Sequence, residues 1–255
     1  MSNLHLKIHG SIAELRLDNP AKLNALTVQM LDALEAHCRT IEKNSEIRAV
    51  ILAAEGDRAF CVGADINAWA DLPPGDFARH WVRDGHRAID RLAQLSLPTI
   101  AAISGHAFGG GLELATACDL RVIAPNATLA LPETGVGIVP GWSGSQRLSK
   151  HLPPAMLREM ALLGRRLSAD RAFQVGYVNA VSDDPRATAL EMAHEISGKS
   201  PRATEVTKYM IQAALGEDTN AMIEALGGGM IFGTEDKAEG VAAFREKRKP
   251  KFPGK

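Results

Sequence analysis

The segment Arg48–Ala54, RAVILAA, is apolar at every position after its arginine, and Thr99–Ser104, TIAAIS, is nearly as apolar. A strand with one face in water alternates polar and apolar residues, whereas a strand covered on both faces reads as a continuous apolar run. Such strands belong to sheets, mostly parallel, that carry helices on their faces. The two runs therefore predict an α/β protein with a buried sheet.

The segments around these runs predict strands and helices in alternation. Leu4–Ile8 and Ile12–Leu17 alternate in polarity about the turn His9-Gly10-Ser11, which is typical of a β-hairpin. Thr27 can cap a helix whose apolar residues recur every three or four positions. The other elements expected up to residue 181 are, in chain order, a helix over 76–95, a short helix from Gly109-Gly110-Gly111 to Cys118, a strand over 120–124, helices over 154–164 and 168–176, and a strand over 177–181.

The last quarter of the chain predicts helices only. One helix is expected from Ser200-Pro201 to Gly216, and another begins near Thr234. Strand pairs followed by helices predict a core of ββα units over residues 1–195, and residues 196–255 form the predicted helical region.

Composition and charge restrict the partners of this chain. Its 255 residues carry a formal net charge of -1 at pH 7, so no overall field draws them to nucleic acid or to an anionic membrane. No run approaches the ~18 apolar residues of a membrane span, and Met1–Gly10 lacks the pattern of a signal peptide. Cys38, Cys61 and Cys118 form no CxxC pair, and an odd count does not suit a disulfide framework. We therefore expect a cytoplasmic protein with reduced cysteines.

Three segments carry residues suited to chemistry. In the first, Phe60–Ile66, FCVGADI, a small residue follows glycine, so the N–H of Ala64 can face a ligand as one half of an oxyanion hole. The same pattern also suits a plain connection in which glycine makes the turn and Asp65 caps a helix. The residues alone leave both interpretations open.

The second segment is Gly105–Glu113, GHAFGGGLE, in which three glycines precede a helix. Without side chains, these glycines let a ligand approach the backbone closely. A helix N-terminus adds unpaired N–H groups and a dipole that favours negative charge. Glu113 then lies in the first turn, near any ligand that the glycines hold, although a glutamate there also stabilises a helix through the dipole alone.

The third segment is Leu131–Trp142, LPETGVGIVPGW. Glu133 lies among apolar residues, where burial raises a carboxyl pKa and favours an acid at neutral pH; a solvated loop glutamate is the alternative. Two carboxylates and two N–H donors together suit chemistry beside a thioester carbonyl. The donors would stabilise an enolate oxygen, while the carboxylates would carry protons and hold water.

The three segments resemble the signature regions of the enoyl-CoA hydratase/isomerase (crotonase) superfamily. The resemblance covers nearly the whole chain, from Asn19–Leu26, NPAKLNAL, through FCVGADI, IAAISGHAFGGGLELATACDLRV and LPETGVGIVPGWSGSQRL to AFREKRKPKF near the C-terminus. It implies the crotonase (ClpP-like) fold, an α/β superhelix of ββα units followed by a C-terminal helical trimerisation region. It also implies an enoyl-CoA hydratase, which adds water to a trans-2-enoyl thioester of coenzyme A.

The resemblance assigns roles to individual residues. It implies oxyanion-hole donors at the N–H groups of Ala64 and Gly110, activation of water by Glu113, and proton exchange at the α-carbon by Glu133. Since the two glutamates share one water, we expect them to titrate as a coupled pair. The residues implied to contact the substrate or its CoA are Lys22, Leu23, Ala25, Ala64, Asp65, Ile66, Asn67, Gly109, Gly110, Pro132, Trp142, Phe244 and Lys247.

The C-terminal contacts and the assembly also follow from the resemblance. Phe244 and Lys247 form an F-x-x-K pattern that in relatives reaches the CoA of a neighbouring subunit. The basic run Lys247-Arg248-Lys249 also suits a solvated tail. A homo-oligomer, either a trimer or a pair of trimers, is the expected assembly. The resemblance implies no metal or redox cofactor, and CoA enters as part of the substrate.

The acyl group of the substrate stays open. Trp142 stands where familiar members of the superfamily have a small residue, and Trp69 and Trp81 lie in a variable region. These three side chains either narrow the acyl pocket or are simply buried aromatics. Short straight-chain, methyl-branched, glutaconyl-type and carnitinyl thioesters are all candidates, and either direction of reaction fits.

Other activities fit less well. The run Gly141–Ser145 approaches the G-x-S-x-G motif of serine hydrolases but ends in serine and follows no strand. Gly135-x-Gly137 is followed by Pro140 where a dinucleotide site needs a helix, and no histidine pair has metal-ligand spacing. Within the superfamily, the alternatives are a Δ3-Δ2 enoyl-CoA isomerase, a carnitinyl-type dehydratase and an acyl-CoA thioester hydrolase. A non-catalytic or RNA-binding relative is the alternative of another class, which the lack of a basic and aromatic array disfavours.

Overall fold

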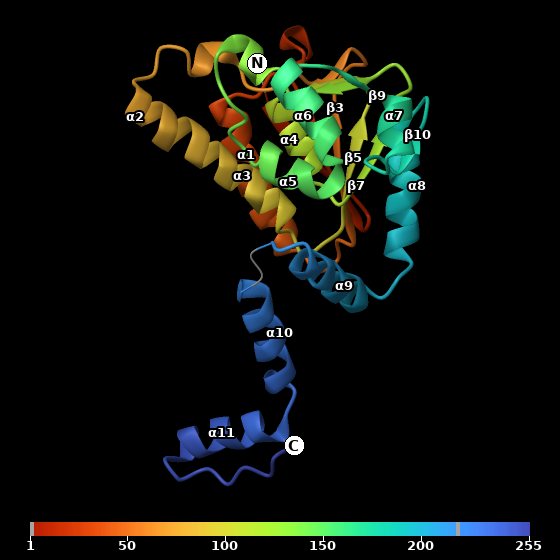
Figure 1. Cartoon of the computed structure of the whole chain (residues 1–255). Helices are drawn as coiled ribbons and strands as arrows, with labels where there is room; N and C mark the ends of the chain where they lie inside the picture. Colours follow the sequence, from red (N-terminus) through yellow and green to blue (C-terminus); the bar gives the residue numbers. More distant parts are fainter. Residues whose placement is uncertain (1–2, 218–219) are drawn as a thin grey trace. The chain divides into compact units, whose positions relative to one another are not determined.

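The computed structural model describes residues 3–217 and 220–255 of the chain (Figure 1). The chain divides into two compact units, residues 1–204 and 205–255. The first unit is an α/β structure with two sheets, and the described part of the second is helical. The predicted boundary at residue 195 lies within helix α8 (Pro185–Ser197). A role of the C-terminal region in trimerisation stays a prediction.

A six-stranded sheet forms the centre of the first unit, in the order β1-β2-β3-β5-β7-β10. The hairpin of β1 and β2 is antiparallel, as predicted, and every later pair of neighbours is parallel. The two apolar runs form the adjacent strands β3 and β5, which are almost wholly buried. The strands are Asn3–His9 (β1), Ile12–Asp18 (β2), Ala49–Ala54 (β3), Thr99–Ile103 (β5), Leu120–Ile123 (β7) and Ala180–Val181 (β10).

A second sheet has four short strands in the order β4-β6-β8-β9. The first three each follow a strand of the large sheet and precede a helix, so the ββα unit repeats along the chain. This repetition confirms the predicted crotonase-type core. Strands this short show no polarity pattern of their own, so the second sheet was not predictable strand by strand. They are Ala59–Cys61 (β4), His106–Phe108 (β6), Thr128–Ala130 (β8) and Leu167–Ser168 (β9).

Helices cover both faces of the large sheet (Figure 1). On one side lies α1 (Val28–Glu42), which Thr27 caps by accepting a hydrogen bond from the N–H of Met30 at 3.3 Å. On the other side, α8 packs Ala189 and Ala193 against the strands, where their small side chains allow a close approach. Both faces of the sheet are therefore buried, as the continuous apolar runs require.

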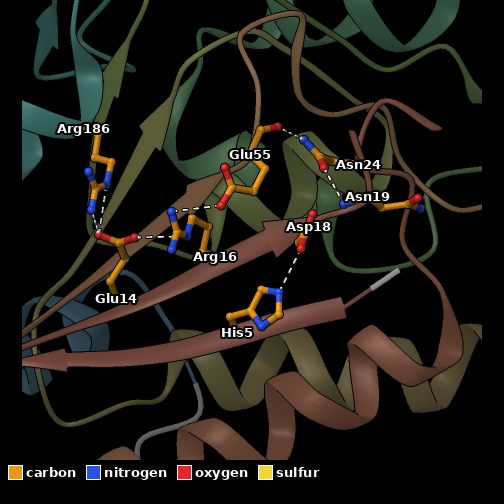
Figure 2. Close-up of polar contacts among 8 residues, drawn as sticks. All are labelled: His5, Glu14, Arg16, Asp18, Asn19, Asn24, Glu55 and Arg186. Atoms are coloured by element: carbon orange, nitrogen blue, oxygen red, sulfur yellow. Dashed lines mark hydrogen bonds and ion pairs between the residues drawn. The ribbon is translucent and has the colours of Figure 1, made fainter. Parts of the chain in front are cut away.

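An ion network joins α8 to the hairpin (Figure 2). The carboxylate of Glu14, on β2, accepts two hydrogen bonds from the guanidinium of Arg186 at 3.0 and 2.8 Å. Glu14 also lies 3.4 Å from Arg16, which pairs with Glu55 at 2.9 Å. Because the side chain of Glu14 is only 5% exposed, removing Arg186 would leave a poorly compensated buried charge.

The helix predicted over 76–95 forms but is irregular. It runs through α2 (Pro74–Asp76), a π-helical segment η3 (Phe77–Arg83) and α3 (Asp84–Ala93). The wide turns of a π-helix bring residues five apart onto one side. Phe77 and Val82, which are five apart, both line the cavity described below. The helical period predicted this segment as a helix but did not reveal its wider turns.

The remaining elements connect the layers. The strand predicted over 177–181 is shorter, because Tyr177 turns into the core and places its hydroxyl 2.8 Å from Thr116 Oγ1. Among the described residues, none of the helices has both the length and the hydrophobicity to cross a bilayer. The other helices are Pro20–Lys22 (η1), Ile66–Ala68 (η2), Gly110–Thr116 (α4), Glu133–Val136 (η4), Gly144–His151 (α5), Pro154–Leu163 (α6), Ala169–Gln174 (α7), Pro201–Ala214 (α9), Asn220–Phe232 (α10) and Glu235–Glu246 (α11).

Candidate active site

A buried asparagine shapes the loop after β2. Asn24 is fully buried and has a φ of 56°, a left-handed conformation that asparagine tolerates better than most residues. Its side-chain oxygen accepts a hydrogen bond from the N–H of Asn19 at 2.9 Å, and its amide nitrogen donates to the carbonyls of Glu55 and Ala59 at 2.9 Å. Figure 2 shows this side chain between Asn19 and Glu55. The loop is thereby fixed to the segment that leads into β4.

This loop aligns the first predicted oxyanion donor. Leu26 donates its N–H to the carbonyl of Gly63 and accepts from the N–H of Asp65, each at 2.8 Å. In a parallel bridge of this kind, the residue between the two partners directs its own N–H away from the neighbouring strand. That residue is Ala64, which lines the cavity.

The second predicted donor lies opposite, at the start of α4. Gly110 is the first residue of that helix, so its N–H has no intrahelical acceptor. A methyl group placed on Gly110 would lie 3.6 Å from the nitrogen of Ala64, so the two N–H groups belong to one small region. Within the described chain, neither N–H has a hydrogen-bond acceptor. The geometry suits two donors to a single oxygen.

Close packing explains two of the three consecutive glycines. Gly109 has a φ of 49°, and a methyl group on it would lie 2.7 Å from Glu133 Oε1. A methyl group on Gly111 would lie 2.1 Å from the carbonyl oxygen of Cys61, so α4 packs directly on β4. Side chains at these positions would displace either a carboxylate or the helix itself.

The middle glycine of the three, Gly110, leaves room for the ring of Trp142. A methyl group on Gly110 would lie 2.6 Å from the Trp142 ring, and one on Gly85 would lie 2.4 Å from its Nε1. The indole is therefore wedged between the starts of α4 and α3. Its Nε1 donates to the carbonyl of Trp81 at 3.3 Å, and the two indole rings lie 5.4 Å apart.

Glu113 is a buried carboxylate with fixed hydrogen bonds. It is 3% exposed, and its Oε1 accepts from the N–H groups of Trp142 at 2.8 Å and Gly144 at 2.7 Å. Burial raises the pKa of Glu113 to about 7, with the two N–H groups and Arg147 opposing the rise and the charge of Glu133 adding to it. Near neutral pH, this group can therefore both release and accept a proton.

Glu133 is held differently. It is 7% exposed and begins the short helix η4 after Pro132. Its Oε2 has no hydrogen-bond partner within the described residues, and burial raises its pKa above the ordinary value for glutamate. A buried carboxylate without such partners favours the protonated form.

Both carboxylates and both N–H groups line one cavity of about 160 Å³. Of the residues predicted to form the site, eight are in its lining: Ala64, Ile66, Gly109, Gly110, Glu113, Pro132, Glu133 and Trp142. Sequence reasoning missed much of the apolar wall, which includes Val62, Phe77, Val82, Val136, Ile138 and Val139. These apolar residues carry no local signal that separates them from core residues. Trp69 and Trp81, considered as pocket residues from the sequence, also belong to the lining.

The other predicted contact residues lie outside that lining. Lys22 donates to Asp65 at 2.7 Å, and this hydrogen bond lowers the pKa of Asp65. Asp65 also caps η2 by accepting from the N–H of Asn67 at 3.2 Å, as the plain interpretation of FCVGADI expects. Leu23 accepts from the N–H of Val62 at 3.2 Å, so it supports the cavity wall from behind.

Three further residues predicted to contact the substrate, Ala25, Phe244 and Lys247, also lie outside the cavity lining. Ala25 is buried beside the loop, with its carbonyl accepting a hydrogen bond from Asn19 at 2.9 Å. Phe244 and Lys247 belong to the second unit, where Phe244 is 86% exposed and Lys247 ends α11 in a left-handed conformation. Their contact with CoA stays a prediction. Across the described residues, no group of three His, Cys, Asp or Glu side chains could hold a metal ion.

Comparisons with known proteins indicate one family. The family model described as enoyl-CoA hydratase/isomerase matches residues 7–255. A short-chain-enoyl-CoA hydratase of Clostridium acetobutylicum is 34% identical over 253 residues, which cover 98% of this chain and 97% of the relative. A carnitinyl-CoA dehydratase of Proteus mirabilis is 35% identical over an alignment of 263 positions, gaps included, that covers 99% of each chain.

Solved structures agree with the sequence relatives. An enoyl-CoA hydratase from Bacillus anthracis matches with a TM-score of 0.81 at 33% identity, covering 99% of this chain and 100% of that one. The match therefore includes the whole α/β core as well as the helical region.

Proposed function

The chain belongs to the enoyl-CoA hydratase/isomerase family, and from that premise we propose that it adds water reversibly to a trans-2-enoyl thioester of coenzyme A. The observation that carries this proposal is a single cavity with two buried carboxylates and two backbone N–H groups that lack acceptors in the described chain. Hydration of a conjugated thioester needs both kinds of group.

The N–H groups of Ala64 and Gly110 would bind the thioester oxygen. When water adds at the β-carbon, negative charge moves to this oxygen and forms an enolate. Two donors held rigidly by the backbone stabilise that charge, and one such donor is typically worth ~10²–10³ in kcat. The dipole of α4, whose N-terminus is Gly110, adds to the stabilisation.

The two glutamates would divide the proton transfers. Glu113, whose pKa burial raises to about 7, is suited to take a proton from water as it attacks. Glu133, whose pKa burial also raises and whose Oε2 has no partner among the described residues, is suited to deliver a proton to the α-carbon. Because they interact, the pair titrates as a unit. The proposed reaction uses no metal or redox cofactor, and CoA is part of the substrate.

Two carboxylates in one cavity favour hydration over isomerisation, which needs only one acid/base group to move a proton between carbons. A carnitinyl-type dehydration uses the same groups in reverse, so it stays as an alternative direction. A thioester hydrolase that acts through a serine is less favoured, because Ser143, which follows the lining residue Trp142, is not itself in the cavity lining.

Trp142 is proposed to restrict the acyl chain. Its ring lies against Gly110, so it forms a wall beside the reacting carbons. With Trp69, Phe77 and Trp81 it leaves a mostly apolar space, which suits a short acyl group without charge. We also propose that Lys22, Leu23, Ala25, Asp65 and Asn67 lie along the CoA path, and that Phe244 and Lys247 complete it in a cytoplasmic trimer or pair of trimers.

The test follows the absorbance of the conjugated thioester with 2-enoyl-CoA substrates of four, eight and sixteen carbons. We expect loss of absorbance with crotonyl-CoA, formation of the 3-hydroxyacyl product, and no free thiol. In Trp142→Ala, the kcat/KM for the eight-carbon substrate divided by that for the four-carbon substrate is expected to rise about tenfold or more. In Trp142→Phe, this ratio is expected to lie between the values of the wild type and Trp142→Ala. Release of thiol from the wild type, or conversion of a 3-enoyl thioester without water uptake, would replace hydration by hydrolysis or isomerisation.

A further inference from the structure

The hydrogen bonds that hold Glu113 come from the two residues on either side of Ser143. Its Oε1 accepts from the N–H groups of Trp142 and Gly144. A methyl group on Gly144 would lie 2.7 Å from the same oxygen, so the turn 142–144 fits closely around the carboxylate. The position of Glu113 therefore depends on what holds Ser143.

Ser143 is in an unfavourable backbone conformation. It has a φ of 74° and a ψ of 14°, in the left-handed region that glycine adopts without cost. It occupies the N-cap position of α5, yet its hydroxyl caps no N–H of that helix. A glycine would make the same turn without strain. The hydroxyl therefore needs another explanation.

The hydroxyl faces a histidine on another helix. Ser143 Oγ lies 3.1 Å from Nδ1 and 3.3 Å from Nε2 of His86 in α3. His86 Nε2 lies 3.0 Å from Asp90 Oδ2. The other oxygen of Asp90 pairs with the guanidinium of Arg147, and the backbone N–H of Arg147 donates to the carbonyl of Ser143 at 2.8 Å. These contacts form a closed ring from the turn to α3 and back.

This ring of contacts includes a serine, a histidine and an aspartate, which are the residue types of a serine hydrolase. The serine, however, does not lie at the cavity. Ser143 is 8% exposed and does not line the cavity, so its hydroxyl cannot reach a thioester held there. The adjacent residues Trp142 and Gly141 do line the cavity. The hydroxyl thus faces the support of the site rather than the substrate.

We propose that Ser143 and His86 are positioning residues, which hold the turn 142–144 so that its two N–H groups keep Glu113 in place. The proposal rests on the proposed function, in which Glu113 activates water. Ser143 Oγ lies at similar distances from both nitrogens of His86, so it contacts the face of the imidazole, while Nε2 of the same ring lies beside Asp90. Asp90, which pairs with Arg147, then orients the imidazole of His86.

A positioning role has a measurable electrostatic consequence. The charged groups that act on Glu113 are Glu133 and Arg147, together with the two N–H groups of the turn. If the turn loosens, those N–H groups stabilise the carboxylate less, and its pKa rises. A defect of folding alone would lower the amount of active protein without moving this pKa.

A set of variants distinguishes the effect of the Ser143 hydroxyl from the effect of the strained backbone. Ser143→Gly removes both the hydroxyl and the backbone strain, whereas Ser143→Ala removes the hydroxyl and keeps the strain. His86→Leu removes the partner, and His86→Gln restores one hydrogen-bonding group. His80→Gln is the matched control, because His80 lies in the same helical stretch with a side chain that is 66% exposed and whose only polar partner among the described residues is Asp84.

The pKa of Glu113 is measured in the full-length protein by NMR of carboxyl-labelled glutamates, with Glu113→Gln to assign the signal. We expect a rise of about one pH unit in Ser143→Gly, Ser143→Ala and His86→Leu, a smaller rise in His86→Gln, and none in His80→Gln. A rise of one unit from 7 lowers the ionised fraction at pH 7 by about fivefold. The acid limb of kcat with crotonyl-CoA is expected to move by the same amount.

Failure of this proposal is distinct from failure of the proposed function. An unchanged pKa of Glu113 in folded Ser143→Gly would overturn the positioning role, whatever the wild type catalyses. A wild type that does not hydrate enoyl thioesters, but whose Glu113 responds to Ser143, would overturn the function and keep the positioning of the carboxylate.

Discussion

The two carboxylates of the cavity have the same chemistry and almost the same burial, but they are held in different ways. Glu113 projects from a regular helix, and its Oε1 accepts two backbone hydrogen bonds from the turn 142–144. Glu133 begins a short helix after a loop, and its Oε2 has no partner in the described part of the chain. The two carboxylates therefore differ in their surroundings rather than in residue type, which supports the different roles proposed for them.

The two carboxylates differ in the groups that oppose the effect of burial on their pKa. Fixed N–H groups stabilise the ionised form of Glu113 and oppose the effect of burial. Glu133 has only the N–H of its own backbone to oppose burial. Burial raises the pKa of both carboxyls, so their different hydrogen bonds, rather than opposite pKa shifts, support the proposed division of the proton transfers.

The largest expected effects come from removing either carboxylate. Glu113→Gln and Glu133→Gln should each lower kcat for crotonyl-CoA by ~10²–10⁴, while the exposed Glu191→Gln should not. The two variants can be distinguished by measuring the exchange of the α-protons of butyryl-CoA in D₂O. Glu113→Gln should retain this exchange and Glu133→Gln should lose it, because Glu133 is the proposed carrier at the α-carbon. Equal loss in both variants would contradict the division of roles.

The next effect comes from displacing the carboxylates without removing them. In Gly109→Ala the new methyl group would lie 2.7 Å from Glu133 Oε1, and in Gly144→Ala it would lie 2.7 Å from Glu113 Oε1. Because misplacement by about an ångström can cost ~10²-fold, we expect losses of that order in kcat. Gly135→Ala is the control, since nothing lies within 4 Å of its added methyl group.

The two glycine variants should also differ from each other. Gly109 has a φ of 49°, so alanine there adds backbone strain and lowers thermal stability, whereas Gly144 has an ordinary φ. Thermal unfolding measured beside kcat would distinguish strain from displacement. Wild-type kcat in both variants would mean that the carboxylates tolerate movement.

The smallest expected effect is on stability as a function of pH. Burial raises the pKa of Glu113 to about 7 from 4.5, so the folded chain holds a proton that the unfolded chain releases. This contribution to stability is complete below pH 4.5 and is lost as pH rises through about 7. Glu113→Gln, which cannot ionise, should therefore unfold a few °C higher than wild type at pH 8 and about equally at pH 4. A difference that does not depend on pH would contradict the raised pKa.

The sequence by itself determined the layers of this protein and the main features of its site. The continuous apolar runs of β3 and β5 predict strands with two covered faces, because no other arrangement buries every side chain. Thr27 marks the start of α1, since its oxygen satisfies an N–H that the helix leaves unpaired. The glycines before Glu113 and the apolar surroundings of Glu133 are local signals, and the resemblance to a family added the roles of both residues.

Only the tertiary structure decided which residues meet across long stretches of chain. Ser143 contacts His86 from 57 positions away, and the tight fit of Trp142 against both Gly110 and Gly85 involves three separate segments. Phe77, Trp81 and Val82 of the π-helical segment η3 all line the cavity, and the helical period of the sequence does not separate such lining residues from core residues. Local propensity depends on neighbours in the chain, whereas these contacts depend on how whole elements pack. For that reason, the support of Glu113 became visible only in the folded molecule.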